Sequence, residues 1–303
     1  MSKQEIDPGL GEKFGQQTKR LINPNRSFNV KRHNAGFSPK DVYHYLVNLS
    51  WTKFFLIIFA GYFLVNLLFG AVYYVIGIEN LRNAIDKSPM HSFMNAYFFS
   101  VQTFTTVGYG GIVPSGLTAN FIASIEAMIG LLGFAIATGL LFGRFSRPSA
   151  RILFSRNAIV TPYHGITAIM FRLANLRNND LIEVETNLLA VFLDKSTNSR
   201  KYYGMKLERK SIYFFPLSWT VVHPLDEDSP FFNKSPEELK DLQAEILVQF
   251  KGFDDTFSQT VHTRFSYTFD EIIWNAKFKP AFNSDHKGQV VFDLNRIHDY
   301  ELL

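Results

Sequence analysis

The sequence predicts a two-part fold, a helical membrane domain followed by an all-β domain. Residues 54–78 and 117–142 are long apolar segments, each long enough to cross a bilayer. Between them lies a shorter apolar run that ends in a glycine-rich stretch. Residues 152–303 are more polar and carry short apolar runs separated by turn residues, the pattern of a β-sandwich. The fold class we expect is therefore membrane α plus all-β.

Residues 1–35 are rich in Lys, Arg, Gln, Asn and Gly and show no sustained apolar period. We expect most of this stretch to be a polar tail, of which a short part can pair with a sheet edge. Residues 36–50 differ, because Ser38 and Pro39 form a helix start. Apolar residues then recur on one helical face, namely Val42, Tyr45, Leu46 and Leu49. Such an amphipathic helix lies in the membrane interface; the alternative is a simple extension of the first span.

The membrane domain is expected to cover residues 51–143. Its outer helix spans 51–78, with Trp51 and Lys53 as interfacial anchors. A re-entrant helix is expected over 92–105, since that apolar run is too short to cross. An inner helix follows over 117–143.

The glycine-rich stretch reads TTVGYG, and its last five residues are expected to form an ion filter over 106–110. An ion that enters a membrane must exchange its water shell for other oxygens, and stacked backbone carbonyls from four chains supply them to K⁺. Inward-facing carbonyls need backbone conformations that glycine tolerates best. The expected K⁺ ligands are Thr106, Val107, Gly108 and Tyr109, with Gly110 closing the stretch.

In the inner helix, residues at four-residue spacing are expected to form one stripe facing a central axis: Glu126, Gly130, Phe134, Thr138 and Phe142. On that face Phe134 and Phe142 are gate candidates, because apolar rings close a pore by dewetting. The alternative is that both rings pack against the outer helix or lipid. Gly130, with Gly133, and Gly139 are expected to be bending points, and Gly139 with Gly143 forms a close-packing face. Glu126 is the only ionisable group of this span; it is a pore-lining candidate, or is hydrogen-bonded behind the filter or protonated.

Basic residues flank the membrane segments on one side and predict that both termini are cytoplasmic. Residues 144–151 form a basic linker directly after the inner helix. We expect anionic headgroups to be bound by a set of cations near the interface, Lys40, Lys53, Arg144, Arg147 and Arg151. A topology signal alone explains the same cluster equally well.

In the β domain, residues 152–303, the expected strands are 158–161, 167–173, 181–193, 212–222, 245–250 and 260–266. Ser235 and Pro236 begin a short helix with acidic residues in its first turn. The chain has no cysteine, which excludes disulfides and thiolate metal sites. No metalloprotease, serine-hydrolase, P-loop or Rossmann motif occurs, so an enzyme is not expected. No nucleic-acid partner is expected, since the net charge of +4 is concentrated at the membrane flanks.

With these elements placed, the sequence resembles the inward-rectifier potassium channels, most closely their prokaryotic branch. Besides TTVGYG, the resemblance rests on motifs in the family's order: Ser50-Trp51, Arg147-Pro148, Leu153-Phe154-Ser155, Arg172–Arg177, Leu217–Leu225 and Asp270–Trp274. It implies a homotetramer in the inner (plasma) membrane and an immunoglobulin-like cytoplasmic domain that extends the pore. It implies gating at the inner helices, with lipid and the cytoplasmic domain as modulators.

The resemblance also implies acidic rings at Glu183 and Asp255, which concentrate cations and hold Mg²⁺ or polyamines as blockers; a solvated strand face is the alternative. No cofactor is implied besides K⁺ in the filter. Three positions depart from many relatives: Phe134 lacks the polar group of strong rectifiers, and Gln102 and Ile112 replace an acid and an arginine around the filter. A non-conducting, membrane-anchored β-sandwich that binds a partner or lipid is the competing hypothesis from another class.

Overall fold

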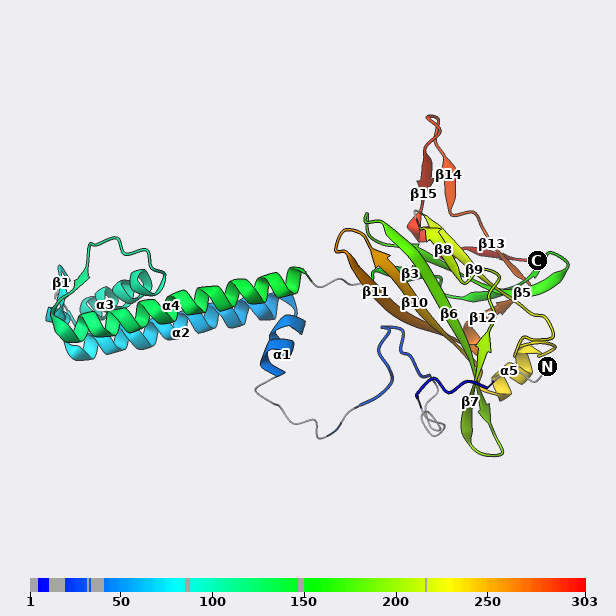
Figure 1. Cartoon of the computed structure of the whole chain (residues 1–303), viewed down its shortest axis with the longest axis horizontal. Helices are drawn as coiled ribbons and strands as arrows, with labels where there is room; N and C mark the ends of the chain where they lie inside the picture. Colours follow the sequence, from blue (N-terminus) through cyan, green and yellow to red (C-terminus); the bar gives the residue numbers. More distant parts are fainter. Residues whose placement is uncertain are drawn as a thin grey trace. The chain divides into compact units, whose positions relative to one another are not determined.

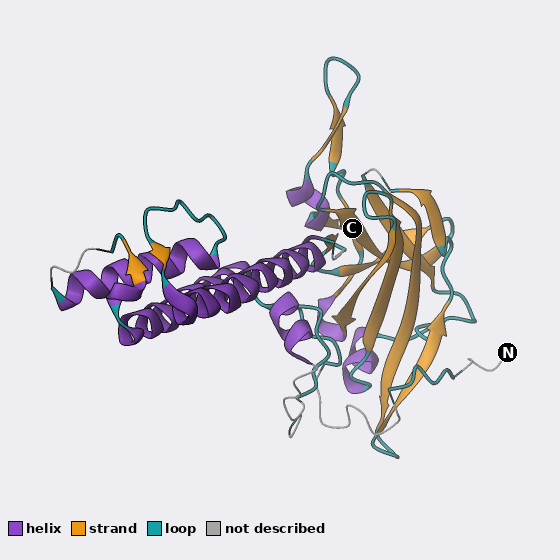
Figure 2. Ribbon diagram, turned by 60° about the vertical axis from the view of Figure 1, so that its left-hand side comes forward, coloured by secondary structure: helices purple, strands orange, loops and turns teal. Residues whose placement is uncertain are grey.

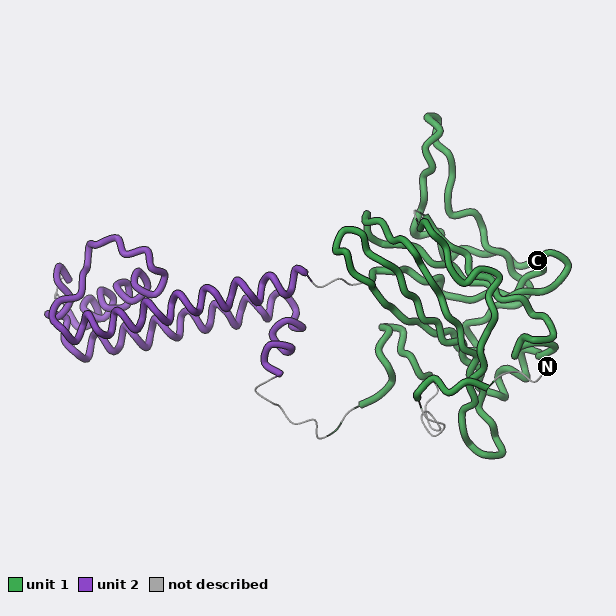
Figure 3. Tube along the Cα trace, in the orientation of Figure 1, with its two compact units in different colours: residues 1–33, 148–303 green, residues 34–147 purple. Residues whose placement is uncertain are grey.

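The computed structural model describes residues 5–10, 20–31, 33, 41–84, 88–146, 150–215 and 217–303 (Figure 1). The chain divides into two compact units, which Figure 3 colours separately. One is a membrane unit, residues 34–147. The other, the β unit, combines residues 1–33 with 148–303. Ser38, Pro39, Lys40 and Arg147, which the sequence assigned to the interfacial helix start and to lipid binding, lie outside the described residues.

The membrane unit consists of four helices, α1 (Val42–Asn48), α2 (Trp51–Ile76), α3 (Pro89–Phe104) and α4 (Gly116–Phe145), with a one-turn helix at Ile78–Asn80. A small pair of strands, β1 (Leu81–Arg82) and β2 (Val113–Pro114), joins the two segments that flank α3. Both α2 and α4 are long and apolar enough to span a membrane, as expected. The short helix α3 starts earlier than residue 92 because the Ser88 hydroxyl caps the His91 amide and Pro89 fills the first helical position.

The β unit is a sandwich of two sheets that share one core (Figure 2). The first sheet has the order β11-β10-β6-β7, with β8 also on β6. Its strands are β6 (Leu181–Asp194), β7 (Ser199–Met205), β8 (Ser211–Phe214), β10 (Glu245–Asp254) and β11 (Gln259–Thr268). The second sheet has the order β12-β4-β5-β3, with β9 also on β5. Its strands are β3 (Ile152–Phe154), β4 (Ala158–Tyr163), β5 (Ile166–Asn175), β9 (Ser218–Pro224) and β12 (Ile272–Trp274).

The core lies where apolar side chains of β5 meet those of β6 and β10, including Phe171, Ala190 and Phe250, each at most 1% exposed. Its burial is the main force that holds the two sheets together. The described residues of the unit also contain two small strand pairs, β13 (Ala276–Phe278) with β16 (Tyr300–Leu302) and β14 (Phe282–Ser284) with β15 (Val290–Phe292). Its short helices are α5 (Pro236–Asp241) and 3-10 helices at Phe269–Glu271 and Leu294–His298.

The strand prediction was wrong in one place and incomplete in others. Residues 212–222 are two strands, β8 and β9, that belong to different sheets. The sequence has a proline at 216, which lacks the N–H that a continuous ladder needs, and the apolar run concealed this break. The expected strands also lacked β3, β7 and all strands after β11. The helix start at Ser235 is confirmed, since Ser235 and Glu238 form a reciprocal capping box for α5.

The expected pairing of a short part of the tail with a sheet edge is confirmed at Glu5, which bridges to Tyr203 of β7. The tail prediction was wrong for residues 20–30, which pack against the first sheet. Leu21 is fully buried, and its amide donates to both carboxylate oxygens of Glu245, at 3.1 and 2.9 Å. Arg20 forms an ion pair of 2.7 Å with Glu271 and donates to the Ser266 carbonyl. Burial raises the pKa of the Glu245 carboxyl, although the hydrogen bonds from Ser266, Leu21 and Ile22 oppose that shift.

Candidate functional site

The predicted filter alternates between left- and right-handed backbone. Thr106, Gly108 and Gly110 have φ of 58°, 54° and 78°, whereas Val107 and Tyr109 between them do not have positive φ. An alternation of this kind turns every second peptide, so that successive N–H groups gather on one side and successive carbonyls on the other. The glycines adopt it without strain, while Thr106 holds a conformation that costs a non-glycine residue about 1 kcal/mol or more.

The last turn of α3 leads directly into this stretch. The Gln102 carbonyl accepts from the amides of Val107 and Gly108, at 3.0 and 3.3 Å. The end of the helix therefore fixes the start of the stretch by main-chain bonds, which do not depend on side-chain identity. Within one chain Val107 and Tyr109 are 54% and 81% exposed, so neither residue packs against its own chain.

Glu126 lies behind α3 and is fully buried. Its carboxylate accepts from the Tyr73 hydroxyl of α2 at 2.7 Å and from the Ser100 hydroxyl of α3 at 2.5 Å. One carboxylate thus ties three helices together. The pore-lining assignment of Glu126 is wrong, and the alternative of a hydrogen-bonded group behind the filter describes its position.

Gly130 is a packing position against α3. A Cβ added there would lie 1.9 Å from the Phe104 carbonyl oxygen, so no larger residue fits without moving one of the helices. The helix α4 continues through Gly130 without interruption. Gly139, in contrast, has no neighbour within 4 Å of an added Cβ, and Gly143 faces the Tyr43 hydroxyl of α1. The bending role predicted for Gly130 and Gly139 stays a prediction.

The single stripe on α4 was a wrong interpretation. At 3.6 residues per turn, four-residue steps drift, and the direction at position 142 is turned roughly 160° from that at 126. Accordingly Glu126 is buried inside the unit, whereas Phe134 and Phe142 are 74% and 72% exposed. Both rings are exposed in the single chain, and Glu126 lies on a different face of α4.

Arg144, at the end of α4, caps the interfacial helix α1. Its guanidinium donates to the carbonyls of Leu46, Val47 and Leu49, at 2.7, 3.0 and 2.8 Å. These acceptors are carbonyls that a helix end leaves unpaired. The same guanidinium lies 4.5 and 4.4 Å from the ring centres of Trp51 and Phe54. Arg144 is therefore engaged within the chain, and its assignment to headgroup binding is replaced by helix capping.

Two protein-family models match the chain, the inward rectifier potassium channel C-terminal domain over residues 152–302 and the ion channel model over residues 61–147. The chain is 37% identical over 289 residues to inward rectifier potassium channel Kirbac3.1 of Paramagnetospirillum magnetotacticum, covering 92% of this chain and 95% of that protein. The chain belongs to the inward rectifier potassium channel family. Inward rectifier potassium channel 18 of Homo sapiens is 28% identical, covering 85% of this chain and 64% of that protein. ATP-sensitive inward rectifier potassium channel 12 of Bos taurus shows the same identity, with 85% and 65% covered.

The acidic candidates of this family member lie at one end of the β6–β10 pair. Glu183 is exposed and has φ of 50°, in a bulge of β6 that faces Gly252 on β10. Asp255 is exposed in the turn after β10, and its amide reaches the Asp180 carbonyl at 3.4 Å. The two acidic residues therefore lie at the same end of the sheet. Of the remaining lipid candidates, Lys53 and Arg151 are exposed.

Sequence reasoning missed the partners of Glu126, which are Tyr73 and Ser100, and the capping role of Arg144. The sequence does contain a signal for the buried polar cluster around Glu126. Asn66 and Ser100 are polar residues inside apolar helical runs, where polar groups usually mark an interaction. Both are fully buried, and the Ser100 hydroxyl lies 3.3 Å from the Asn66 amide oxygen. No sequence signal identified the contact of Gly130 with Phe104.

Proposed function

We propose that four copies of the chain surround an axis and conduct K⁺ passively through residues 106–110. The observation that supports this proposal is the alternating sign of φ over Thr106 to Gly110, a backbone on which successive carbonyls can face one side. One chain presents a single column of oxygens, and a K⁺ ion needs several such columns to replace its hydration shell. The family membership and the exposed Tyr109 support assembly around that axis.

In this proposal Phe134 and Phe142 close the pathway below the filter by excluding water. Glu183 and Asp255 form acidic rings that concentrate cations and bind Mg²⁺ or polyamines. Lys53 and Arg151, together with Lys40 and Arg147, hold anionic headgroups. The protein lies in the plasma membrane with both termini in the cytoplasm, since the basic residues flank its spans on that side. No reaction is catalysed.

The test is rubidium uptake into liposomes that contain the purified full chain and are loaded with K⁺. We expect rubidium uptake that Ba²⁺ blocks and that is absent when the liposomes are loaded with Na⁺ in place of K⁺. The control is Gly108→Ala, because a Cβ at φ of 54° strains the filter backbone while nothing lies within 4 Å of that Cβ in one chain. We expect this variant to assemble and to lose selective uptake. Absence of selective uptake from assembled wild-type tetramers would overturn the proposal and favour a non-conducting membrane anchor.

A further inference from the structure

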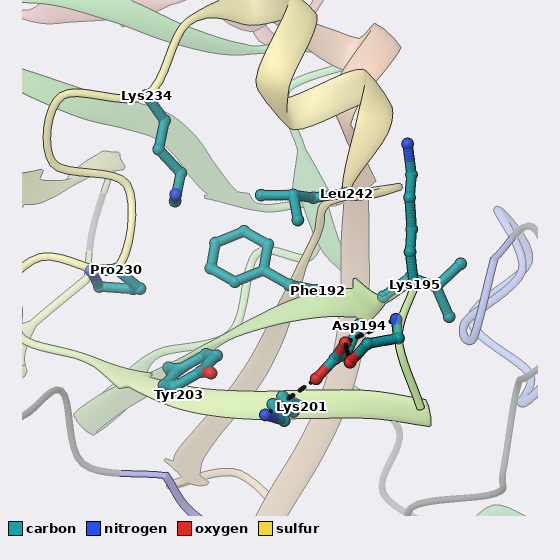
Figure 4. A pocket seen from close by; sticks show the side chains of 10 residues that line it. Phe192, Asp194, Lys195, Lys201, Tyr203, Pro230, Lys234 and Leu242 are labelled. Carbon is teal, nitrogen blue, oxygen red and sulfur yellow. Dashed lines mark hydrogen bonds and ion pairs between the residues drawn. The ribbon is translucent and has the colours of Figure 1, made fainter. Parts of the chain in front are cut away.

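The β unit contains a cavity whose lining includes none of the residues assigned to ion passage. It has a volume of about 610 Å³ and lies between the β6–β7 hairpin and the segment around α5 (Figure 4). This volume is in the range of sites that bind small molecules, roughly 300–1,000 Å³. All its lining residues belong to the β unit, so its shape depends on that unit alone.

One part of the cavity wall is apolar and partly aromatic, and the rest carries charged side chains. The Phe192 and Tyr203 rings lie 5.7 Å apart, centre to centre, at an angle of 42°. Leu242 and Pro230 cover the sides (Figure 4). Such a surface favours a flat apolar body, because ring contacts add to the area removed from water.

Two of the three lysines that line the cavity form ion pairs within the chain, and the third, Lys234, can pair with a ligand. The Lys201 ammonium pairs with the Asp194 carboxylate at 3.0 Å, and that carboxylate also accepts from the Ser196 amide and hydroxyl at 2.9 and 2.6 Å. Lys195 pairs with Asp241 at 3.4 Å and points away from Phe192 (Figure 4). The Lys234 ammonium points toward the Phe192 ring, 5.8 Å from its centre. In the part of the chain that the structure describes, no carboxylate lies within ion-pair distance of Lys234.

These charges select the kind of ligand. A cation–π contact at this distance is worth about 0.5–1 kcal/mol, less than an ammonium gains from a desolvated anion. A cationic ligand would find Asp194 already paired, and a neutral one would cover Lys234 without neutralising it. We propose that this cavity binds a small organic anion whose aromatic body lies against the joined surface of Phe192 and Tyr203 and whose anionic group pairs with Lys234.

The test is calorimetric titration of the detergent-solubilised full chain with 1-naphthalenesulfonate. The neutral 1-naphthalenemethanol serves as the ligand control. Lys234→Met removes the ammonium but keeps a side chain that covers Phe192. Lys195→Met is the matched control variant, because its ammonium faces Asp241. We expect saturable binding of the sulfonate, at least tenfold weaker for Lys234→Met and for the neutral analogue, and within twofold of wild type for Lys195→Met.

A second measurement reports the place of binding. The Ile6 amide donates to the Tyr202 carbonyl at 2.9 Å on β7, next to Tyr203. We expect saturating sulfonate to slow hydrogen exchange at this amide in wild type and not in Lys234→Met. Equal affinity of wild type and Lys234→Met, or no saturable binding by wild type, would overturn the proposal. Both outcomes are independent of the rubidium-uptake test, because no residue that lines the cavity is assigned to the ion pathway.

Discussion

The Tyr73 hydroxyl donates a hydrogen bond of 2.7 Å to the Glu126 carboxylate and thereby joins the outer helix α2 to the inner helix α4. Ser100 on α3 donates to the other carboxylate oxygen. Because all three groups are buried, loss of one donor leaves a carboxylate oxygen of Glu126 without a hydrogen-bond partner that water could replace.

We expect Tyr73→Phe to destabilise the membrane unit by about 1–3 kcal/mol, the cost of an unsatisfied buried acceptor. The measurement is the melting temperature of the full chain in detergent. Tyr74→Phe is the control, since that neighbouring side chain is 40% exposed. A Tyr73→Phe melting temperature equal to that of wild type would show that the bond contributes nothing to stability.

Gly130 offers a second test of how α4 positions α3. We expect Gly130→Ala to force the two helices apart, because the new Cβ would meet the Phe104 carbonyl. Assembly and rubidium uptake should both fall several-fold. Gly139→Ala, with open space around its Cβ, should retain both. Normal uptake by Gly130→Ala would mean that the end of α3 tolerates displacement.

Arg144 is expected to hold the end of α1. Its replacement by Gln removes donors from three carbonyls at once, so hydrogen exchange in residues 45–48 should accelerate at least several-fold. Arg144→Lys should be intermediate, because an ammonium lacks the planar fork of the guanidinium. Lys53→Gln, at an exposed position, is the control. Unchanged exchange in Arg144→Gln would contradict the capping role.

The two exposed aromatic rings of α4 are separable by single substitutions. If Phe142 closes the pathway, Phe142→Ala should raise the open probability in bilayer recordings, because a smaller ring of side chains stays wetted. Phe134→Ala should then have the smaller effect. The reverse order would move the gate to Phe134, and no change in either variant would place it outside α4.

His223 predicts a pH dependence of the β unit. It is 1% exposed, with Nδ1 2.6 Å from the Lys206 carbonyl and Nε2 2.8 Å from the Ser229 hydroxyl. Burial lowers the pKa of this imidazole below its ordinary value, so the unfolded chain takes up the proton first. Stability should therefore be complete above about pH 6.5 and fall as the pH drops from there toward the lowered pKa.

The measurement is the melting temperature of the full chain between about pH 7 and pH 5. His223→Gln should reduce the slope, whereas His262→Gln, at an exposed position of β11, should keep it. The same slope in His223→Gln as in wild type would assign the pH dependence to other groups.

Local features of the sequence predicted the membrane helices and the handedness of the filter backbone. Uncharged length decides whether a helix can span, and Gly108 and Gly110 tolerate the positive φ that the structure gives them. The surroundings of Glu126 were not predictable in this way. Its partners Tyr73 and Ser100 come from other helices, and spacing along α4 does not give the rotation of α2 or α3.

Long-range pairing also explains the errors in the β unit. The run 212–222 is mostly apolar, but its two halves pair with β6 and β5 in different sheets. Leu21 lies in a polar stretch and is buried by residues far along the chain, since it packs with Val191 and Leu247 while Glu245 accepts its amide. Arg144 was assigned to lipid from its charge and place after a span, whereas its acceptors are carbonyls of α1.

Because residues 20–30 pack inside the β unit, the chain connects the two units at two places. Since the chain starts in the β unit, passes through the membrane unit and returns, the membrane unit is an insertion with two covalent attachments. The β unit is therefore joined by peptide bonds to both ends of the membrane unit, before α1 and after α4.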